Sequence, residues 1–300
     1  MRLHLRLLIC NLLLMASLGQ VANAETLLRW KFTEGETLEV TVDQHTVTAT
    51  TGAGKPTGID ITMQLRMAWT IGAVAEDGSA RMTQQFERFA VTMKSGTAEA
   101  IEYDSDSESK PSGSAANIAA AVSPVIGAEF AVTMTNRGAI RDVKLSDAAS
   151  EAFNSVESPA LKQLFSAEGI SRLLSQAAVE FPEAEVATNS EWATTLVTPS
   201  ALGTLKQDRT YTLTTPEDIN GKTLERINLS GRLVIEAGEQ APSKSTLIDQ
   251  ELTGTMLFDA EAGRLVSSQS TQKLTTERPF REFRIKVQTT AETKTSIKSR

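Results

Sequence analysis

The sequence lacks most of the side chains that build disulfide bonds and transition-metal sites. It has one cysteine and two histidines among 300 residues, and both Cys10 and His4 lie in the first 24. Those 24 residues resemble an export signal, and without them the chain keeps one histidine, His45, and no cysteine. Disulfide bonds, thiolate nucleophiles and zinc sites with several histidine or cysteine ligands are therefore excluded from residues 25–300.

Aromatic and basic residues are scarce as well. Aromatic residues make up 5% of the chain, whereas sugar clefts and single-stranded nucleic-acid grooves depend on aromatic platforms. Removing Arg2 and Arg6 with the first 24 residues leaves 28 basic residues against 37 acidic ones, a net charge of −9. This sign repels nucleic-acid phosphates and anionic lipids. We expect no nucleic-acid partner and no stable membrane insertion, and an apolar ligand or a protein partner stays open.

An apolar run near the N-terminus has the pattern of a signal peptide. It follows the basic start MRLHLR, extends from Leu7 to Gly19 and is followed by the small residues Ala22 and Ala24. Its 13 residues are too few to cross a bilayer, which takes about 20. We therefore expect cleavage after Ala24, with residues 1–24 as the signal peptide and residues 25–300 as a single β-rich domain in an extracytoplasmic space, periplasmic or secreted.

Strand patterns dominate the rest of the chain. The clearest is IDITMQLRMAWTIGAVA, residues 59–75, in which every odd position is apolar and most even positions are polar. This alternation predicts a strand of about 55 Å with one buried face, which is too long to stay flat and implies a curved sheet. The other predicted strands are 37–50, 80–93, 98–103, 128–134, 140–145, 192–198, 211–215, 224–236, 246–258, 265–272 and 282–291.

Turns and parity changes indicate how these strands connect. Glycine follows acidic, amide or charged residues in four segments between strands, which predicts antiparallel hairpins at 75–80, 135–140, 218–223 and 259–264. The apolar face changes parity near Gln44 and again near Glu87. One extra residue shifts parity in this way, so we expect a β-bulge at each position.

The centre of the chain, about residues 146–181, is predicted to be helical. The main helix is expected over 157–182, with Ser158 as its cap and Pro159 in its first turn. Shorter helices are expected at 147–154 and 115–122. The predicted fold is α+β, with a long curved antiparallel sheet of about twelve strands, approaching a half-barrel and packed by the central helices.

The acids of the segment DSDSESKPSGS are a candidate calcium site. Asp104, Asp106 and Glu108 have the spacing of the first ligands of a calcium-binding loop. The motif fails at two defining positions, because Ser109 replaces its glycine and Ala115 replaces its final glutamate. A plain acidic loop is the preferred interpretation, and we expect no metal site.

No catalytic residues are predicted. Asp43 and His45 share one face of a strand, as a carboxylate that orients an imidazole would, but a strand surface is a poor place for a desolvated base. The sequence also lacks a GxSxG turn, a phosphate loop and a dinucleotide fingerprint, so we expect no cofactor. An enzyme that uses carboxylates alone stays an alternative, although no pair of acids stands out.

Methionines on the predicted strands suggest a different site. Thioether side chains adapt to irregular apolar ligands, so the inner wall of a curved sheet could hold an acyl chain. The candidate wall consists of Ile61, Met63, Leu65, Met67 and Met82. Ordinary core packing beneath the central helix is the competing interpretation.

Four segments resemble a family of exported bacterial proteins described only as a domain of unknown function. They are WKFTEGE (30–36), VTMTNRGAIRDV (132–143), EFPEAEVATNSEW (180–192) and GTMLFDAEAGRL (254–265). The resemblance implies export and a β-rich fold and transfers no catalytic residues; the architecture is also similar to the periplasmic lipoprotein-carrier fold. We expect an exported, non-catalytic binding or structural module, with a carrier of a lipid or lipidated protein as the alternative.

Overall fold

One antiparallel sheet of thirteen strands organises the chain. The computed structural model describes residues 25–52, 56–155, 166–200, 203–236 and 246–300. In spatial order the sheet contains β7 (Ile140–Leu145), β6 (Glu129–Met134), β4 (Ala80–Ser95), β3 (Thr57–Val74), β2 (Thr37–Thr51), β15 (Phe283–Ser299), β14 (Arg264–Phe280), β13 (Thr246–Asp259), β12 (Lys222–Glu236), β10 (Gly203–Leu213) and β9 (Glu191–Ser200). β5 (Ile101–Asp104) pairs with β4, β11 (Glu217–Ile219) pairs with β12, and β1 (Glu25–Thr26) and β8 (Val186–Ala187) form a separate pair.

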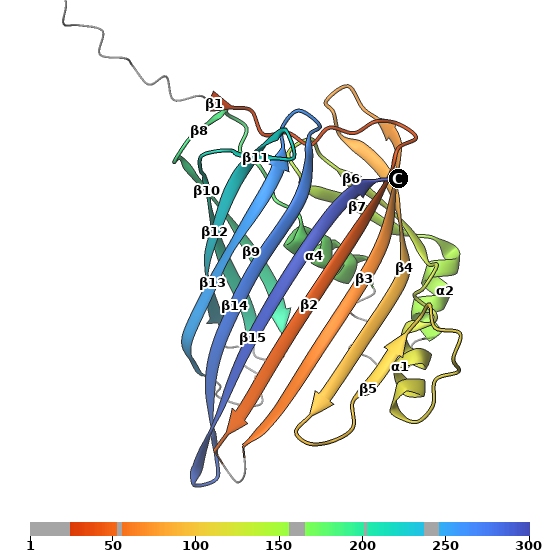
Figure 1. Cartoon of the computed structure of the whole chain (residues 1–300), viewed down its shortest axis with the longest axis vertical. Helices are drawn as coiled ribbons and strands as arrows, with labels where there is room; N and C mark the ends of the chain where they lie inside the picture. Colours follow the sequence, from red (N-terminus) through yellow and green to blue (C-terminus); the bar gives the residue numbers. More distant parts are fainter. Residues whose placement is uncertain (1–24, 53–55, 156–165, 201–202, 237–245) are drawn as a thin grey trace, which may run out of the picture.

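The sheet is strongly curved but does not close into a barrel. In Figure 1 its two ends, β7 and β9, both lie behind the central strands β2, β3 and β15. Helix α4 (Ala167–Ala177) lies between them and contacts both, while α1 (Ser114–Val122) contacts β5 and α2 (Asp147–Ser155) contacts β6 and β7. The predicted α+β class and the long, bent antiparallel sheet are confirmed.

One end of the sheet, here called the packed end, is covered by other parts of the chain. It holds the hairpin turns at 75–79, 135–139 and 260–263, and residues 28–36 cross over it. The Trp30 amide donates to the Asn136 carbonyl at 2.7 Å, and the Lys31 amide donates to the Gly263 carbonyl at 2.8 Å. These bonds tie the start of the domain to two hairpins that lie far away in the sequence.

An aromatic cluster fills the core beneath this cover. The rings of Phe181 and Phe258 lie 4.8 Å apart, and Trp30 meets Phe258 edge-on at 5.7 Å. Trp192 stacks on Tyr211 at 5.3 Å and reaches Phe181 at 6.3 Å. Edge-to-face and offset contacts of this kind stabilise a core beyond the burial of area alone. The four segments that carried the family resemblance therefore meet at the packed end.

The predicted turns and one of the two predicted bulges are confirmed. Each of the four hairpins contains a glycine with positive φ. Glu87 is the extra residue of a bulge, because Arg66 pairs with Arg88 whereas the next residue of β3, Met67, pairs with Phe86. A bulge shifts the pairing register by one residue and bends the strand that carries it, so this one favours a curved sheet.

The predicted bulge at Gln44 is wrong. β2 pairs without interruption with both β3 and β15. The apparent change of parity arises because Val47 lies on the outer face, where it is 41% exposed, while Gln44 and Thr46 take the inner positions. An exposed valine on a strand satisfies β propensity and imitates a change of face.

The helices agree with the predictions in part, because the main helix, expected to continue to residue 182, ends at Ala177, where the backbone of Ala178 is extended. α1 and α2 match the expected short helices within one residue. α4 begins at Ala167, where the Ser166 hydroxyl accepts a hydrogen bond from the Gly169 amide at 3.0 Å. Its buried residues Ile170 and Leu174 face the core, as the apolar stripe predicted. The expected cap at Ser158 and Pro159 lies outside the described residues. Among the helices described, none has the length and apolar character to cross a membrane.

Candidate functional site

The face of the sheet that carries the core, here called the inner face, loses its cover along β3. At the packed end Ile71, Trp69 and Met67 are 1%, 8% and 4% exposed. The next residues on the same face, Leu65, Met63 and Ile61, are only half-buried, and Ile59 is 42% exposed. Leu65, Met63 and Ile61 are called the inner row below. Toward the end opposite the packed end, here called the open end, the same strand face changes from core to accessible wall.

The structure thus divides the predicted ligand wall into two parts. The inner row supplies Ile61, Met63 and Leu65 as neighbours on one accessible face. Met67 lies on the same face but inside the core, and Met82 on β4 is 1% exposed. These two methionines pack in the interior, whereas Ile61, Met63 and Leu65 stay partly exposed, with Leu65 packed against the edge of the core.

The inner row belongs to a wider apolar flank. Leu65, Met63 and Ile61 pair across the sheet with Phe89, Val91 and Met93 of β4. β5 continues the surface, because Val91 pairs with Tyr103, whose ring lies 6.4 Å from that of Phe89. Three adjacent strands therefore present apolar side chains at the same level of the inner face.

The middle of the inner face is polar. On β2, Gln44 and Thr46 pair with Met63 and Ile61. The adjoining positions of β15 and β14 are Thr293, Thr295, Ser268, Ser270 and Gln272. Beyond them β13 and β12 return to apolar side chains at Leu252, Met256, Leu229 and Leu233. Hydroxyl and amide groups thus form a polar strip between two apolar flanks.

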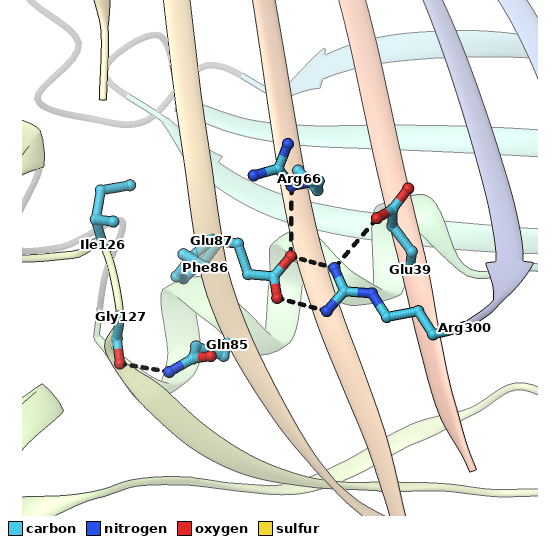
Figure 2. A pocket seen from close by; sticks show the side chains of 8 residues that line it. All are labelled: Glu39, Arg66, Gln85, Phe86, Glu87, Ile126, Gly127 and Arg300. Atoms are coloured by element: carbon cyan, nitrogen blue, oxygen red, sulfur yellow. Dashed lines mark hydrogen bonds and ion pairs between the residues drawn. The ribbon is translucent and has the colours of Figure 1, made fainter. Parts of the chain in front are cut away.

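A second candidate lies on the opposite, outer face near the packed end. It is a pocket of about 440 Å³. Figure 2 shows its lining residues, which are Glu39, Arg66, Gln85, Phe86, Glu87, Ile126, Gly127 and Arg300. The bulge turns Glu87 toward this pocket, where Arg300 donates to it at 2.7 Å and Arg66 lies 3.4 Å away. Arg300 also donates to Glu39 at 3.2 Å. The bulge is predictable from the sequence but the pocket is not, because the pocket residues come from separate segments.

The charges of the outer pocket are matched to one another. The hydrogen bond from Arg300 holds the pKa of Glu87 below its ordinary value, against the opposing effect of burial. A carboxylate held ionised by two arginines cannot donate a proton at neutral pH. The outer pocket therefore gives no support to an enzyme that uses a pair of carboxylic acids.

Two of the three acids of the candidate calcium loop, Asp104 and Asp106, are paired with arginines. Asp104 accepts from Arg88 at 2.7 Å, and Asp106 accepts from Arg66 at 3.0 Å. The Arg88 hydrogen bond also lowers the pKa of Asp104. Over the part of the chain that the structure describes, no group of three or more His, Cys, Asp or Glu residues could hold a metal ion. The expectation that the protein has no metal site stays a prediction.

The histidine and aspartate of the hydrolase hypothesis do not pair with each other. His45 Nε2 lies 2.9 Å from Asp60 Oδ1, and Asp43 accepts a hydrogen bond from Gln64 at 2.7 Å. All four side chains lie on the outer face of β2 and β3. This exposed arrangement offers no desolvated base.

Solved structures show only weak likeness to this chain. Lipovitellin, in a structure concerned with lipid–protein interactions, shares 11% identity with a TM-score of 0.46, over 88% of this chain and 25% of its own. An exported protein with a YmcC-like fold from Bacteroides fragilis shares 10% (TM-score 0.25, 87% and 96% covered). An outer membrane channel from Pseudomonas putida F1 shares 9% (TM-score 0.24, 90% and 97% covered). The chain spans about a quarter of lipovitellin, and likeness at this level carries no argument about function.

The sequence itself places the chain in a family. No curated protein matches it. A family of unknown function, DUF6263, matches residues 77–263, which include the hairpin at 132–143 and the segment 180–192. The match confirms the resemblance that the sequence motifs suggested, and this chain belongs to the DUF6263 family.

Proposed function

We propose that the protein is an extracytoplasmic, non-catalytic binding protein that holds an elongated apolar ligand, such as the acyl chain of a lipid or lipidated protein, against the inner row. The observation that carries this proposal is the change along β3 from a buried face to a half-buried one. A partly covered apolar wall gains free energy when a ligand removes it from water, at about 25 cal/mol per Å².

The neighbouring surfaces suit an amphiphilic ligand. Phe89 and Tyr103, which are half-buried, widen the apolar flank to three strands, while Val91 between them is buried. Met63 at its centre adapts its shape to an irregular chain. The polar strip that begins at Gln44 and Thr46 offers hydroxyl and amide groups to a polar head. An acyl chain on the flank with its head toward the strip would satisfy both surfaces.

The non-catalytic and extracytoplasmic parts of the proposal have separate support. The acids of the outer pocket are ion-paired with Arg66 and Arg300, and the sequence shows no nucleophile motif. Export is supported by the signal pattern that ends at Ala24. Mass spectrometry of the protein from its own host tests export directly, because cleavage after Ala24 leaves the mass of residues 25–300.

The binding test uses residues 25–300 after organic extraction, with cis-parinaric acid as a fluorescent fatty-acid probe. Met63→Gln keeps the length of the side chain and makes it polar, so we expect probe binding about tenfold weaker. Thr62→Gln is the matched control, because Thr62 is the adjacent residue of β3 and is exposed on the outer face. We expect this control to bind like the unmodified protein.

Three outcomes would count against the proposal. The first is the absence of saturable probe binding to residues 25–300. The second is an equal loss of affinity in the Met63 and Thr62 variants, which would point to non-specific adsorption. The third is a Met63→Gln variant that binds the probe as tightly as the unmodified protein. Circular dichroism and the thermal midpoint of each variant separate loss of binding from loss of folding.

A further inference from the structure

The hairpin between β14 and β15 projects at the open end of the sheet and has an unusual composition. Its end, residues 277–286 with the sequence ERPFREFRIK, is called the hairpin tip below. Phe280 pairs with Phe283 across a turn of two residues, Arg281 and Glu282. In Figure 1 this turn lies at the lowest point of the molecule, far from the packed end.

The hairpin tip exposes aromatic rings and positive charge together. Phe280 and Phe283 are 41% and 54% exposed. The guanidinium carbons of Arg278 and Arg281 lie 6.0 Å and 5.6 Å from the centre of the Phe280 ring. With Arg284 and Lys286, the segment has four basic residues against two acidic ones, in a chain whose net charge is −7. Its local sign is opposite to that of the molecule.

The backbone around the hairpin tip is closely held. Arg281 has φ of 54°, in the left-handed region where glycine is the less strained residue. Beside it, Gly52 of the β2–β3 hairpin lies against the Arg284 backbone, and a Cβ at this glycine would overlap the Arg284 carbonyl oxygen. An arginine in this conformation costs free energy, and residues of this kind cluster at functional sites. The turn is therefore a place to look for a function.

We propose that the hairpin tip is a membrane-contacting element, which inserts Phe280 and Phe283 into the headgroup region of anionic bilayers while its arginines bind lipid phosphates. Aromatic rings flanked by arginine and lysine are suited to this interface, because the rings enter the apolar boundary and the cations stay at the phosphates. Basic groups near an anionic surface each strengthen binding about fivefold.

A lipid surface fits the hairpin tip better than an acidic protein does. A stable protein interface covers about 800 Å² and about 20–30 residues on each partner, more than the ten residues of the hairpin tip supply. The overall negative charge repels the rest of the molecule from anionic lipid. Contact would therefore be confined to the hairpin tip and would be reversible, in keeping with the absence of stable insertion expected from the sequence. The proposal does not depend on a ligand at the inner row.

Vesicle flotation tests the proposal with residues 25–300. We expect binding to phosphatidylcholine vesicles that contain about 30% phosphatidylglycerol, and binding about tenfold weaker to phosphatidylcholine alone. The double variant Phe280→Ser/Phe283→Ser should lose about tenfold in affinity for the anionic vesicles. Leu27→Ser/Val197→Ser is the matched control, because these side chains are 48% and 53% exposed elsewhere on the surface. The control should bind like the unmodified protein.

A fluorescent label shows which part of the protein meets the lipid. Residues 25–300 contain no cysteine, so Glu282→Cys provides a single site for an environment-sensitive dye at the turn. We expect its emission to shift to the blue with anionic vesicles, whereas the same dye on Glu76→Cys at the packed end should not respond.

Equal flotation of the Phe280/Phe283 variant and the unmodified protein would overturn the proposal, as would equal binding to neutral and anionic vesicles or an unchanged dye spectrum at position 282. Unchanged cis-parinaric acid binding in the hairpin-tip variant would separate this result from the inner-row test.

Discussion

The packed end and the open end are built from the same strands but differ in what covers them. At the packed end, residues 28–36 cross over the sheet and α4 lies between β7 and β9. At the open end, the β14–β15 hairpin ends in exposed phenylalanines. Along β3 alone, exposure increases from 8% at Trp69 to 42% at Ile59. One sheet therefore combines a closed core with an accessible face.

This contrast suggests that stability and binding are separated along the strands. Regions with many buried apolar contacts open last, and regions with few of them open first. The aromatic cluster and the four family segments lie at the packed end, while the inner row and the hairpin tip lie toward the open end. We expect substitutions at the packed end to change folding and equivalent substitutions toward the open end to change binding.

The largest difference in stability is expected between two variants that each replace one phenylalanine by alanine, one at the packed end and one at the open end. Phe181→Ala removes a ring that is 1% exposed and touches three other aromatic residues, so the free energy of unfolding should fall by about 3–5 kcal/mol. Phe283→Ala removes a ring that is 54% exposed and should change it by less than about 0.5 kcal/mol. Urea unfolding of both variants measures the difference. Similar losses in the two would mean that the ends are equally packed.

A backbone test at the packed end should have a slightly smaller effect. Gly138 has φ of 100°, and a Cβ there would overlap the Val179 carbonyl oxygen. Gly138→Ala should therefore cost about 3 kcal/mol, from backbone strain and from displacement of the neighbouring segment. Gly221→Ala is the control, because its φ of 78° is also positive but nothing lies within 4 Å. It should cost about 1–2 kcal/mol, and equal thermal midpoints for the two variants would contradict the close contact at Gly138.

Local patterns were enough to predict the architecture. Strict alternation identified β3, and glycine-containing turns identified four hairpins. The bulge at Glu87 was predictable because an apolar residue lies on the inner face on either side of it, at Phe86 and Phe89. Each of these features depends on residues close together in the sequence, so one sequence suffices to find them.

Features that depend on distant partners could not be predicted. β10 begins at Gly203 rather than Tyr211, because its polar first half is held by pairing with β9 and β12 rather than by an apolar pattern. The run Ser267–Gln272 lies in the middle of the sheet, paired on both sides, a placement that its polar composition alone does not indicate. For the same reason the sequence predicted the residues of the inner row as part of a ligand wall but could not separate them from Met67 and Met82, which are buried in the core.

Two methionines of β3 test the same difference in burial within a single strand. Met67 and Met63 lie on the same face of β3, but Met67 is 4% exposed and Met63 is half-buried. Met67→Ala should lower the free energy of unfolding by about 2–3 kcal/mol, and Met63→Ala by less than about 1 kcal/mol. Chemical denaturation of both variants tests this, with the probe-binding assay as a second measurement. A larger loss of stability at Met63 would place the boundary of the core closer to the open end.

The smallest effect concerns an ion pair at each end. Glu36 at the packed end accepts from Arg264 at 2.6 Å, and this hydrogen bond lowers its pKa below the ordinary 4.5, against the effect of burial. Since the folded state holds the proton less tightly than the unfolded state, the pair stabilises the fold above about pH 4.5, and this contribution is lost as pH falls through the lower folded-state pKa. Glu36→Gln should therefore cost about 1–2 kcal/mol at neutral pH and progressively less below pH 4.5.

At the open end, Glu277 lies 3.4 Å from Arg284, whose side chain is 80% exposed, so Glu277→Gln should cost less than about 0.5 kcal/mol. Urea unfolding from neutral to acidic pH measures both, and a cost of Glu36→Gln that stays constant down to pH 2 would show that the carboxylate charge is not what stabilises the packed end.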